Sequence, residues 1–80
     1  MATFNRKPAY NESVTARFAL MRVRLNAGGY DAAGAYWGQG APLYWYGDET
    51  ATREGYMRAA DRGDARAAIR SVWPNARFYH

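Results

Sequence analysis

Arginine is the residue type in this chain that is best suited to binding chemistry. Ten of the eleven basic residues are Arg and only Lys7 is Lys, against seven acidic residues, so the net charge is +4. A guanidinium group binds carboxylates and phosphates through two parallel hydrogen bonds and stacks on flat rings. This surplus favours an anionic partner, although the charge alone does not say which one.

Two pairs of arginines are the strongest candidates for contact with such a partner. Arg22 and Arg24 share one face of an expected strand. Arg66 and Arg70 flank the apolar stripe of an expected helix and have no acidic residue four positions away with which to pair. These four guanidinium groups are therefore expected to be free for a partner, or to lie over the edges of the core.

Aromatic residues are concentrated between these two elements, and most of them are expected in the core. Strand alternation places Leu43 and Trp45 on one face and leaves Tyr44 and Tyr46 together on the other. A tyrosine pair exposed beside arginines would suit a protein interface or single-stranded nucleic acid. The predicted partner-binding residues are therefore Arg22, Arg24, Arg66, Arg70, Tyr44 and Tyr46.

The chain offers little for catalysis. The single histidine is the last residue, there is no cysteine, and neither Ser13 nor Ser71 has an obvious base partner. The run Gly38-Gln39-Gly40 begins a phosphate-loop pattern, but a leucine stands where the third glycine belongs. We therefore predict a binding protein and not an enzyme, with no cofactor and no metal site.

The elements that must position these residues are expected to be strands in the first half of the chain. Residues 1–13 are polar and lack periodicity, which predicts a flexible arm that is ordered only by docking. Residues 14–47 are rich in β-branched and aromatic residues interrupted by glycines. They predict a strand over 14–25, a short strand near 35–37 and a further strand over 43–46.

The second half, residues 50–73, is predicted to be helical. A threonine at position 50 or 52 can cap a first helix, behind the acidic pair at 48 and 49. Asp64 can cap a second helix, in which apolar residues recur at helical spacing until Pro74 follows. One continuous helix is the alternative, but it would turn Arg58 into the apolar stripe, and Gly63 favours a break between two helices.

Together these elements predict a single domain over residues 1–80 of the α+β class. A small antiparallel β-sheet of three to four strands would pack against two C-terminal α-helices, with a last short strand over 76–79. A chain of this length buries a limited core, which leaves a homodimer open as a way to extend it.

The glycine-rich segment carries a resemblance to known proteins. The run GGYDAAGAYWGQGAPLY over residues 28–44, with RAADR over 58–62 and ARFY over 76–79, resembles a pattern in small phage and prophage accessory proteins. In size, charge and this pattern the chain is also similar to an anti-CRISPR protein directed at type I-C systems. The resemblance covers roughly residues 22–79. It implies a stoichiometric inhibitor that binds the surveillance complex (Cascade) and prevents target DNA from engaging, and it carries no site residues with it.

The basic character narrows what such an inhibitor would touch. A basic chain does not mimic DNA, so we expect it to cover acidic patches on the protein subunits of the complex, or to compete for nucleic-acid phosphates. The alternatives are a small nucleic-acid-binding phage accessory protein and a virion-associated protein. No apolar run approaches the ~20 residues that span a bilayer and no signal-peptide pattern follows the first residues. We therefore expect no membrane partner and a location in the host cytoplasm.

Overall fold

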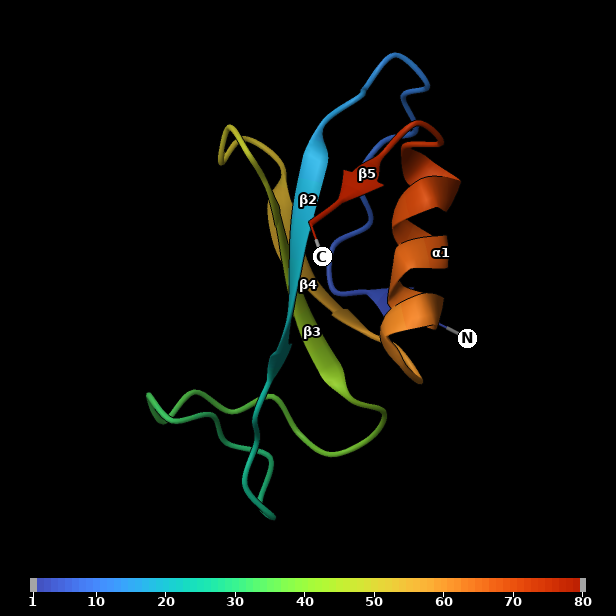
Figure 1. Cartoon of the computed structure of the whole chain (residues 1–80). Coiled ribbons are helices and arrows are strands. Elements are labelled where there is room, and N and C mark those ends of the chain that lie inside the picture. Colours follow the sequence, from blue (N-terminus) through green and yellow to red (C-terminus); the bar gives the residue numbers. More distant parts are fainter. Residues whose placement is uncertain (1, 80) are drawn as a thin grey trace.

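A computed structural model describes residues 2–79 of the chain. Within these residues five strands form one mixed sheet, and a helix covers one of its faces (Figure 1). In chain order the elements are β1 (Thr3–Phe4), β2 (Arg17–Val23), β3 (Leu43–Asp48), β4 (Glu54–Arg58), α1 (Arg62–Val72) and β5 (Arg77–Phe78). The order across the sheet is β1-β4-β3-β2-β5, and all neighbours are antiparallel except β2 and β5.

The core lies between α1 and the two central strands. Phe18 of β2 and Tyr46 of β3 are buried in one cluster with Ile69 and Val72 of α1. Phe18 also stacks on Trp73, with 5.1 Å between the ring centroids. The buried face of β2 therefore packs against the apolar face of α1, as the alternation in β2 and the helical spacing in α1 predict.

The start of α1 is set by two acidic residues. The Asp61 carboxylate accepts a hydrogen bond from the Asp64 N–H at 2.8 Å, and the Asp64 carboxylate accepts one from the Ala60 N–H at 3.0 Å. This reciprocal arrangement satisfies two N–H groups that would otherwise lack partners. The N-cap is thus Asp61, three residues before the cap predicted at Asp64, and the helix ends at Val72, two residues before Pro74.

The predicted α+β fold with two C-terminal helices is wrong. Residues 54–58 form β4, which pairs with β3 along its length, so that one short helix follows instead of two. Five residues that place Met57 in the core and Glu54 in solvent fit a strand as well as a helix, and pairing with β3 decides between them. The sheet is also larger than predicted and mixed, because the two-residue strands β1 and β5 add to its edges.

The segment expected to cap a first helix instead closes the hairpin between β3 and β4. The Asp48 carboxylate accepts hydrogen bonds from the Thr50 hydroxyl at 3.1 Å and from the Thr52 N–H at 2.9 Å. It also accepts from the Arg53 guanidinium at 3.1 Å. The threonines therefore bind an acidic residue that precedes them in the chain and do not begin a helix.

The N-terminal segment, expected to be ordered only by docking, lies against the rest of the domain. Phe4 of β1 pairs with Met57 of β4. The Asn11 N–H donates to Val72 O at 2.9 Å, which ties the segment to the end of α1. Among residues 2–79 there is no helix with the length and hydropathy that crossing a membrane requires.

Candidate functional site

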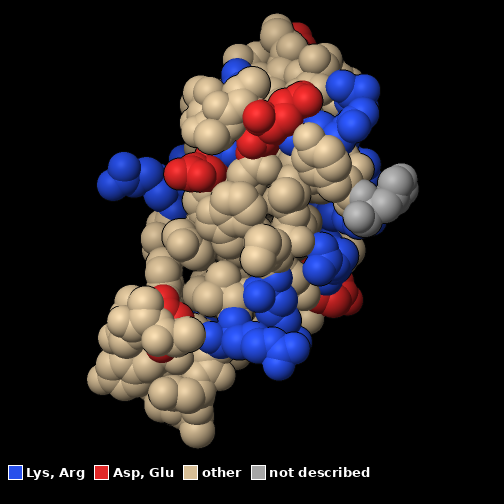
Figure 2. Space-filling view, turned by 60° about the vertical axis from the view of Figure 1, so that its left-hand side comes forward, with Lys and Arg blue, Asp and Glu red and all other residues tan. Residues whose placement is uncertain are grey.

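Seven arginines in or next to β2, α1 and β5 lie along one side of the molecule, and we name them the arginine edge. Parallel pairing places Arg17 opposite Arg77, and α1 brings three more arginines at four-residue spacing against the same strands. Figure 2 shows basic side chains running down one side of the molecule as far as the projecting loop at its base. The arginine edge consists of Arg17, Arg22, Arg24, Arg62, Arg66, Arg70 and Arg77.

Aromatic rings hold part of the arginine edge in place. The guanidinium carbons of Arg66 and Arg70 lie 5.4 and 4.9 Å from the centroid of the Phe78 ring. Arg17 lies 5.3 Å from the centroid of the Tyr79 ring. Such cation–π contacts hold the charged groups above β5. The Arg70 Nε–H also donates to Ala76 O at 3.5 Å, and the Arg66 Nε is buried without a hydrogen-bond partner among residues 2–79.

The arginine edge is not neutralised by the domain itself. Among residues 2–79 the one ion pair joins Arg53 to Asp48, and no carboxylate of these residues lies within 4.0 Å of a guanidinium group of the edge. Several acidic side chains bind backbone N–H groups instead, as Asp61 does at the start of α1. The charge of the edge is therefore not compensated by a carboxylate of residues 2–79, although Arg62, Arg70 and Arg77 donate to backbone carbonyls.

A loop over residues 26–41 projects beyond the ends of β2 and β3 (Figure 1). Asp31 organises it, since its carboxylate accepts hydrogen bonds from the Trp37 indole N–H and the Ala35 N–H, both at 2.9 Å. These two donors, the Trp37 indole first, lower the pKa of the Asp31 carboxyl below its ordinary value. The predicted strand near 35–37 is reduced to a single bridge inside this loop.

Gly29 allows the two arms of the loop to cross closely. Its φ is +86°, and a Cβ atom there would lie 2.5 Å from Gly38 O. The Gly29 carbonyl in turn accepts from the N–H groups of Trp37 and Gly38, at 2.8 and 3.2 Å. Only glycine meets both the left-handed backbone and the short approach at this position.

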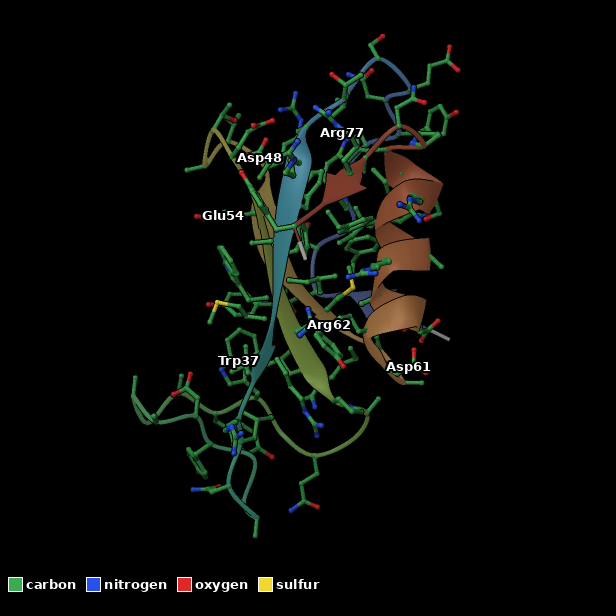
Figure 3. The ribbon with its side chains drawn as sticks, viewed as in Figure 1. Trp37, Asp48, Glu54, Asp61, Arg62 and Arg77 are labelled. Carbon is green, nitrogen blue, oxygen red and sulfur yellow. The ribbon has the colours of Figure 1, made fainter. Side chains whose placement is uncertain are left out.

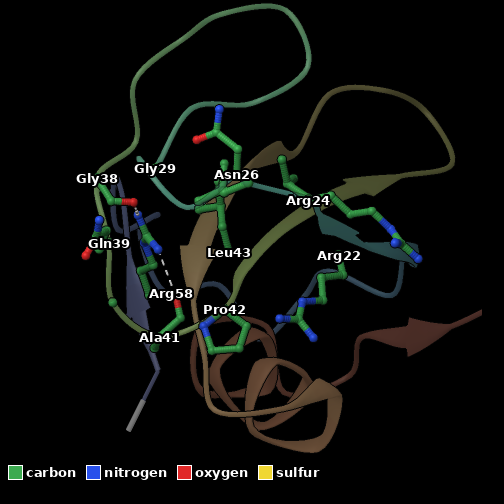
Figure 4. Close-up of a pocket in the computed structure, with 13 residues that line it drawn as sticks. Arg22, Arg24, Asn26, Gly29, Gly38, Gln39, Ala41, Pro42, Leu43 and Arg58 are labelled. Carbon is green, nitrogen blue, oxygen red and sulfur yellow. Dashed lines mark hydrogen bonds between the residues drawn. The ribbon is translucent and has the colours of Figure 1, made fainter.

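Arg58 joins the loop to the sheet. Its guanidinium donates to Ala41 O at 2.8 Å and to Gly38 O at 3.2 Å (Figure 4). It also donates to Trp37 O. The Trp37 ring lies against the ring of Tyr56 in β4, with 4.6 Å between the centroids. The Arg58 guanidinium is thus occupied by backbone carbonyls of the loop.

A groove of about 750 Å³ opens between this loop and the ends of β2 and β3. Arg58 forms one side with its bonds to the loop, while Arg22 and Arg24 line the other side (Figure 4). Neither Arg22 nor Arg24 donates a side-chain hydrogen bond within residues 2–79. The groove therefore continues the arginine edge onto the loop.

The structure brings together the four predicted arginines but not the two tyrosines. Arg22 and Arg24 lie at the groove, and Arg66 and Arg70 lie above β5. Tyr44 and Tyr46 are only 6% and 2% exposed, because the face of β3 that they share is the one covered by α1. Burial also raises the pKa of the Tyr46 hydroxyl. We therefore correct the expectation that either ring meets a partner.

Sequence reasoning missed three members of the arginine edge. Arg62 precedes Arg66 by four residues, so helical spacing could have found it. Arg17 and Arg77 are 60 positions apart in the chain and meet only through the parallel pairing of β2 with β5. No local pattern marks that pairing.

Comparison with known proteins adds no assignment to this surface. A scan against protein-family models, a search of curated proteins and a search of solved structures each found no match. Residues 2–79 also contain no group of three or more acidic or histidine side chains placed to hold a metal ion. The functional argument therefore rests on the geometry of the arginine edge and the groove.

Proposed function

We propose that the protein is a phage-encoded anti-CRISPR inhibitor that binds protein subunits of a type I surveillance complex and keeps target DNA from engaging. One observation carries the proposal: seven guanidinium groups form the arginine edge, and no carboxylate of residues 2–79 lies within 4.0 Å of them. Such an edge complements an acidic patch on a protein partner. The resemblance over residues 22–79 supports the choice of a CRISPR complex as that partner.

The way the arginines are held favours tight pairing with carboxylates. Arg66 and Arg70 are fixed above Phe78, so they lose less conformational freedom on binding than unsupported side chains would. Each can bind a carboxylate through two parallel hydrogen bonds. Stoichiometric binding along the edge would then block the partner surface by occupying it, without any chemical step.

A second candidate function is binding of nucleic acid as a phage accessory protein. The observation that favours it is the pair Tyr30 and Tyr36 on the projecting loop, which are 45% and 67% exposed, with 5.0 Å between their centroids. Exposed rings close to arginines can stack on the bases of a single strand. This function requires affinity for free DNA or RNA that falls steeply with salt concentration.

Size-exclusion chromatography separates the two functions. The purified protein is mixed with a type I-C surveillance complex and, separately, with duplex and single-stranded DNA. We expect co-elution with the complex and none with free DNA. Binding to DNA alone, lost as salt is raised, would replace the inhibitor proposal with the accessory-protein function.

A matched pair of double variants tests the arginine edge within the inhibitor proposal. Arg66→Glu with Arg70→Glu changes the net charge from +4 to 0, and Arg6→Glu with Lys7→Glu makes the same change outside the edge. We expect the first variant to lose binding to the complex and the second to retain it. Thermal melting checks that both domains are folded, because Arg66 and Arg70 also cover Phe78. A folded first variant that still inhibits fully would remove these two residues from the mechanism.

A further inference from the structure

The outer edge of β2 is only partly covered by its neighbour. β5 pairs with the first two residues of β2, whereas β2 continues to Val23. The N–H groups of Arg77 and Tyr79 donate to Ala16 O and Phe18 O, both at 3.0 Å. Among residues 2–79 the backbone ladder on this edge ends there.

A side chain takes the next acceptor on the same edge. Successive residues of a strand direct their backbone groups to opposite edges, so Leu20 and Arg22 face the edge that Phe18 faces. Arg62 donates to Leu20 O at 2.8 Å, and Figure 3 shows Arg62 between α1 and β2. The guanidinium thus occupies the place of a backbone N–H of an added strand, and the exposed Arg22 lies one step further on.

The two faces beside this open edge differ in chemistry. Arg22 shares the α1 side of β2 with buried Phe18, and Arg62 and Arg66 project from α1 on that side. On the opposite side lie Met21, which is 60% exposed, and Val23. A strand added here would meet positive charge on one face and apolar side chains on the other.

A second copy of this chain is a poor occupant of the edge. Antiparallel pairing of two β2 strands would bring Arg22 and Arg24 of one copy close to the same residues of the other. Like charges on adjacent strands destabilise the pairing, and charged edge strands are a common defence against self-association. The charge complementarity therefore selects an acidic partner segment.

We propose that the open edge of β2, from Leu20 to Val23, binds an extended acidic segment of a partner protein by strand addition. The segment would pair with the backbone of Arg22 and displace Arg62 from Leu20 O, freeing that guanidinium for a carboxylate. Carboxylates at every second position would face the arginines, and aliphatic residues between them would cover Met21. This inference rests on the proposed function in taking a protein subunit as the partner.

Proline at position 22 tests the backbone pairing. Arg22→Pro removes the charge and the N–H that faces the open edge, where proline is tolerated in a strand. Arg22→Gln removes the same charge but keeps the N–H. In a titration against the surveillance complex we expect Arg22→Pro to bind about tenfold more weakly than Arg22→Gln, which corresponds to one lost backbone hydrogen bond. Equal affinities of the two folded variants would overturn the inference.

Amide exchange in the unmodified protein provides a measurement that does not depend on the variants folding. The probes are the surveillance complex and a short blocked peptide of alternating Glu and Val, with a Lys and Val peptide as control. We expect exchange of the Arg22 N–H to slow at least about tenfold with the complex and with the Glu and Val peptide, since one hydrogen bond forms. Exchange should be unchanged with the control peptide. Unchanged exchange with both the complex and the Glu and Val peptide would refute strand addition.

The two proposals fail in different ways in these experiments. Binding of the complex without protection of the Arg22 N–H leaves the inhibitor function standing and removes strand addition. Protection by the Glu and Val peptide without binding of the complex supports the edge as a strand-addition site and removes the CRISPR complex as its partner. Protection by the Lys and Val peptide would refute the role assigned to charge.

Discussion

The hydrogen bonds of Arg58 predict how firmly the projecting loop is held. Replacement of Arg58 by Met keeps an unbranched apolar stem but removes the donors to the carbonyls of Trp37, Gly38 and Ala41. The released carbonyls can be hydrated, so the net loss is far below the sum of three charged hydrogen bonds. We expect opening of the loop to become easier by about 1–2 kcal/mol, which is roughly a 5- to 30-fold increase in the open population.

Hydrogen exchange of individual N–H groups measures this opening. The Gly38 N–H and the Trp37 indole N–H, which donate to Gly29 O and to Asp31, should exchange roughly 5- to 30-fold faster in Arg58→Met. Amides of β3 should change less, because that strand is paired on both sides. Arg24→Met is the matched control, since Arg24 lines the same groove without a side-chain hydrogen bond in residues 2–79. Unaltered loop exchange in Arg58→Met would mean that the loop is held by its own turns.

Two further substitutions test the turn and the loop. Burial raises the pKa of the Asp48 carboxyl, but hydrogen bonds, those of Arg53 first, outweigh this effect and leave the pKa below its ordinary value of 3.8. The ionised group therefore stabilises the fold above pH 3.8, and this contribution is lost as the pH falls through the depressed pKa. Asp48→Asn should lower the free energy of unfolding by about 2–3 kcal/mol at neutral pH. The difference in stability between the variant and the native protein should disappear in acid, as thermal melts at several pH values would show. A difference that is the same at every pH would contradict this prediction. Gly29→Ala should lower the free energy of unfolding in urea by about 2 kcal/mol or more, because φ is positive and the new Cβ would meet Gly38 O. Gly34→Ala, with a positive φ but open space around it, should lose only about 1 kcal/mol, and equal losses at both positions would show that the close approach is unimportant.

The fold could be predicted where a pattern is long enough to be unambiguous. Seven residues of β2 alternate clearly enough to predict a strand, and the apolar residues from Ala65 to Trp73 predict α1. Of the short strand predicted over 76–79, residues 77–78 form β5. The segment over 54–58 is too short for its hydrophobic periodicity to distinguish a strand from a helix, so the sequence did not predict its pairing with β3.

The candidate site was predictable in its charge and only partly in its geometry. The lack of acidic residues four positions from Arg66 and Arg70 predicted guanidinium groups without an ion pair. The structure places both above β5, where Arg70 also donates to Ala76 O. The same reasoning correctly kept Tyr44 and Tyr46 on a common face, but it could not say which face α1 covers. The binding roles of the arginines stay predictions until the variants are measured.

The sequence by itself determined the net positive charge, the arginine-rich composition, the faces that residues of β2 and β3 share, and the apolar stripe of α1. The charge and the composition follow from the residue count alone. The shared faces and the stripe depend on residues a few positions apart, where backbone geometry decides which side chains lie together. Only the tertiary structure decided that residues 54–58 pair as β4, that β5 lies parallel to β2, and that the open edge of β2 is lined by arginines. Those features join residues up to 60 positions apart, such as Arg17 and Arg77, and their energies arise from pairing and burial that exist only once the chain has folded.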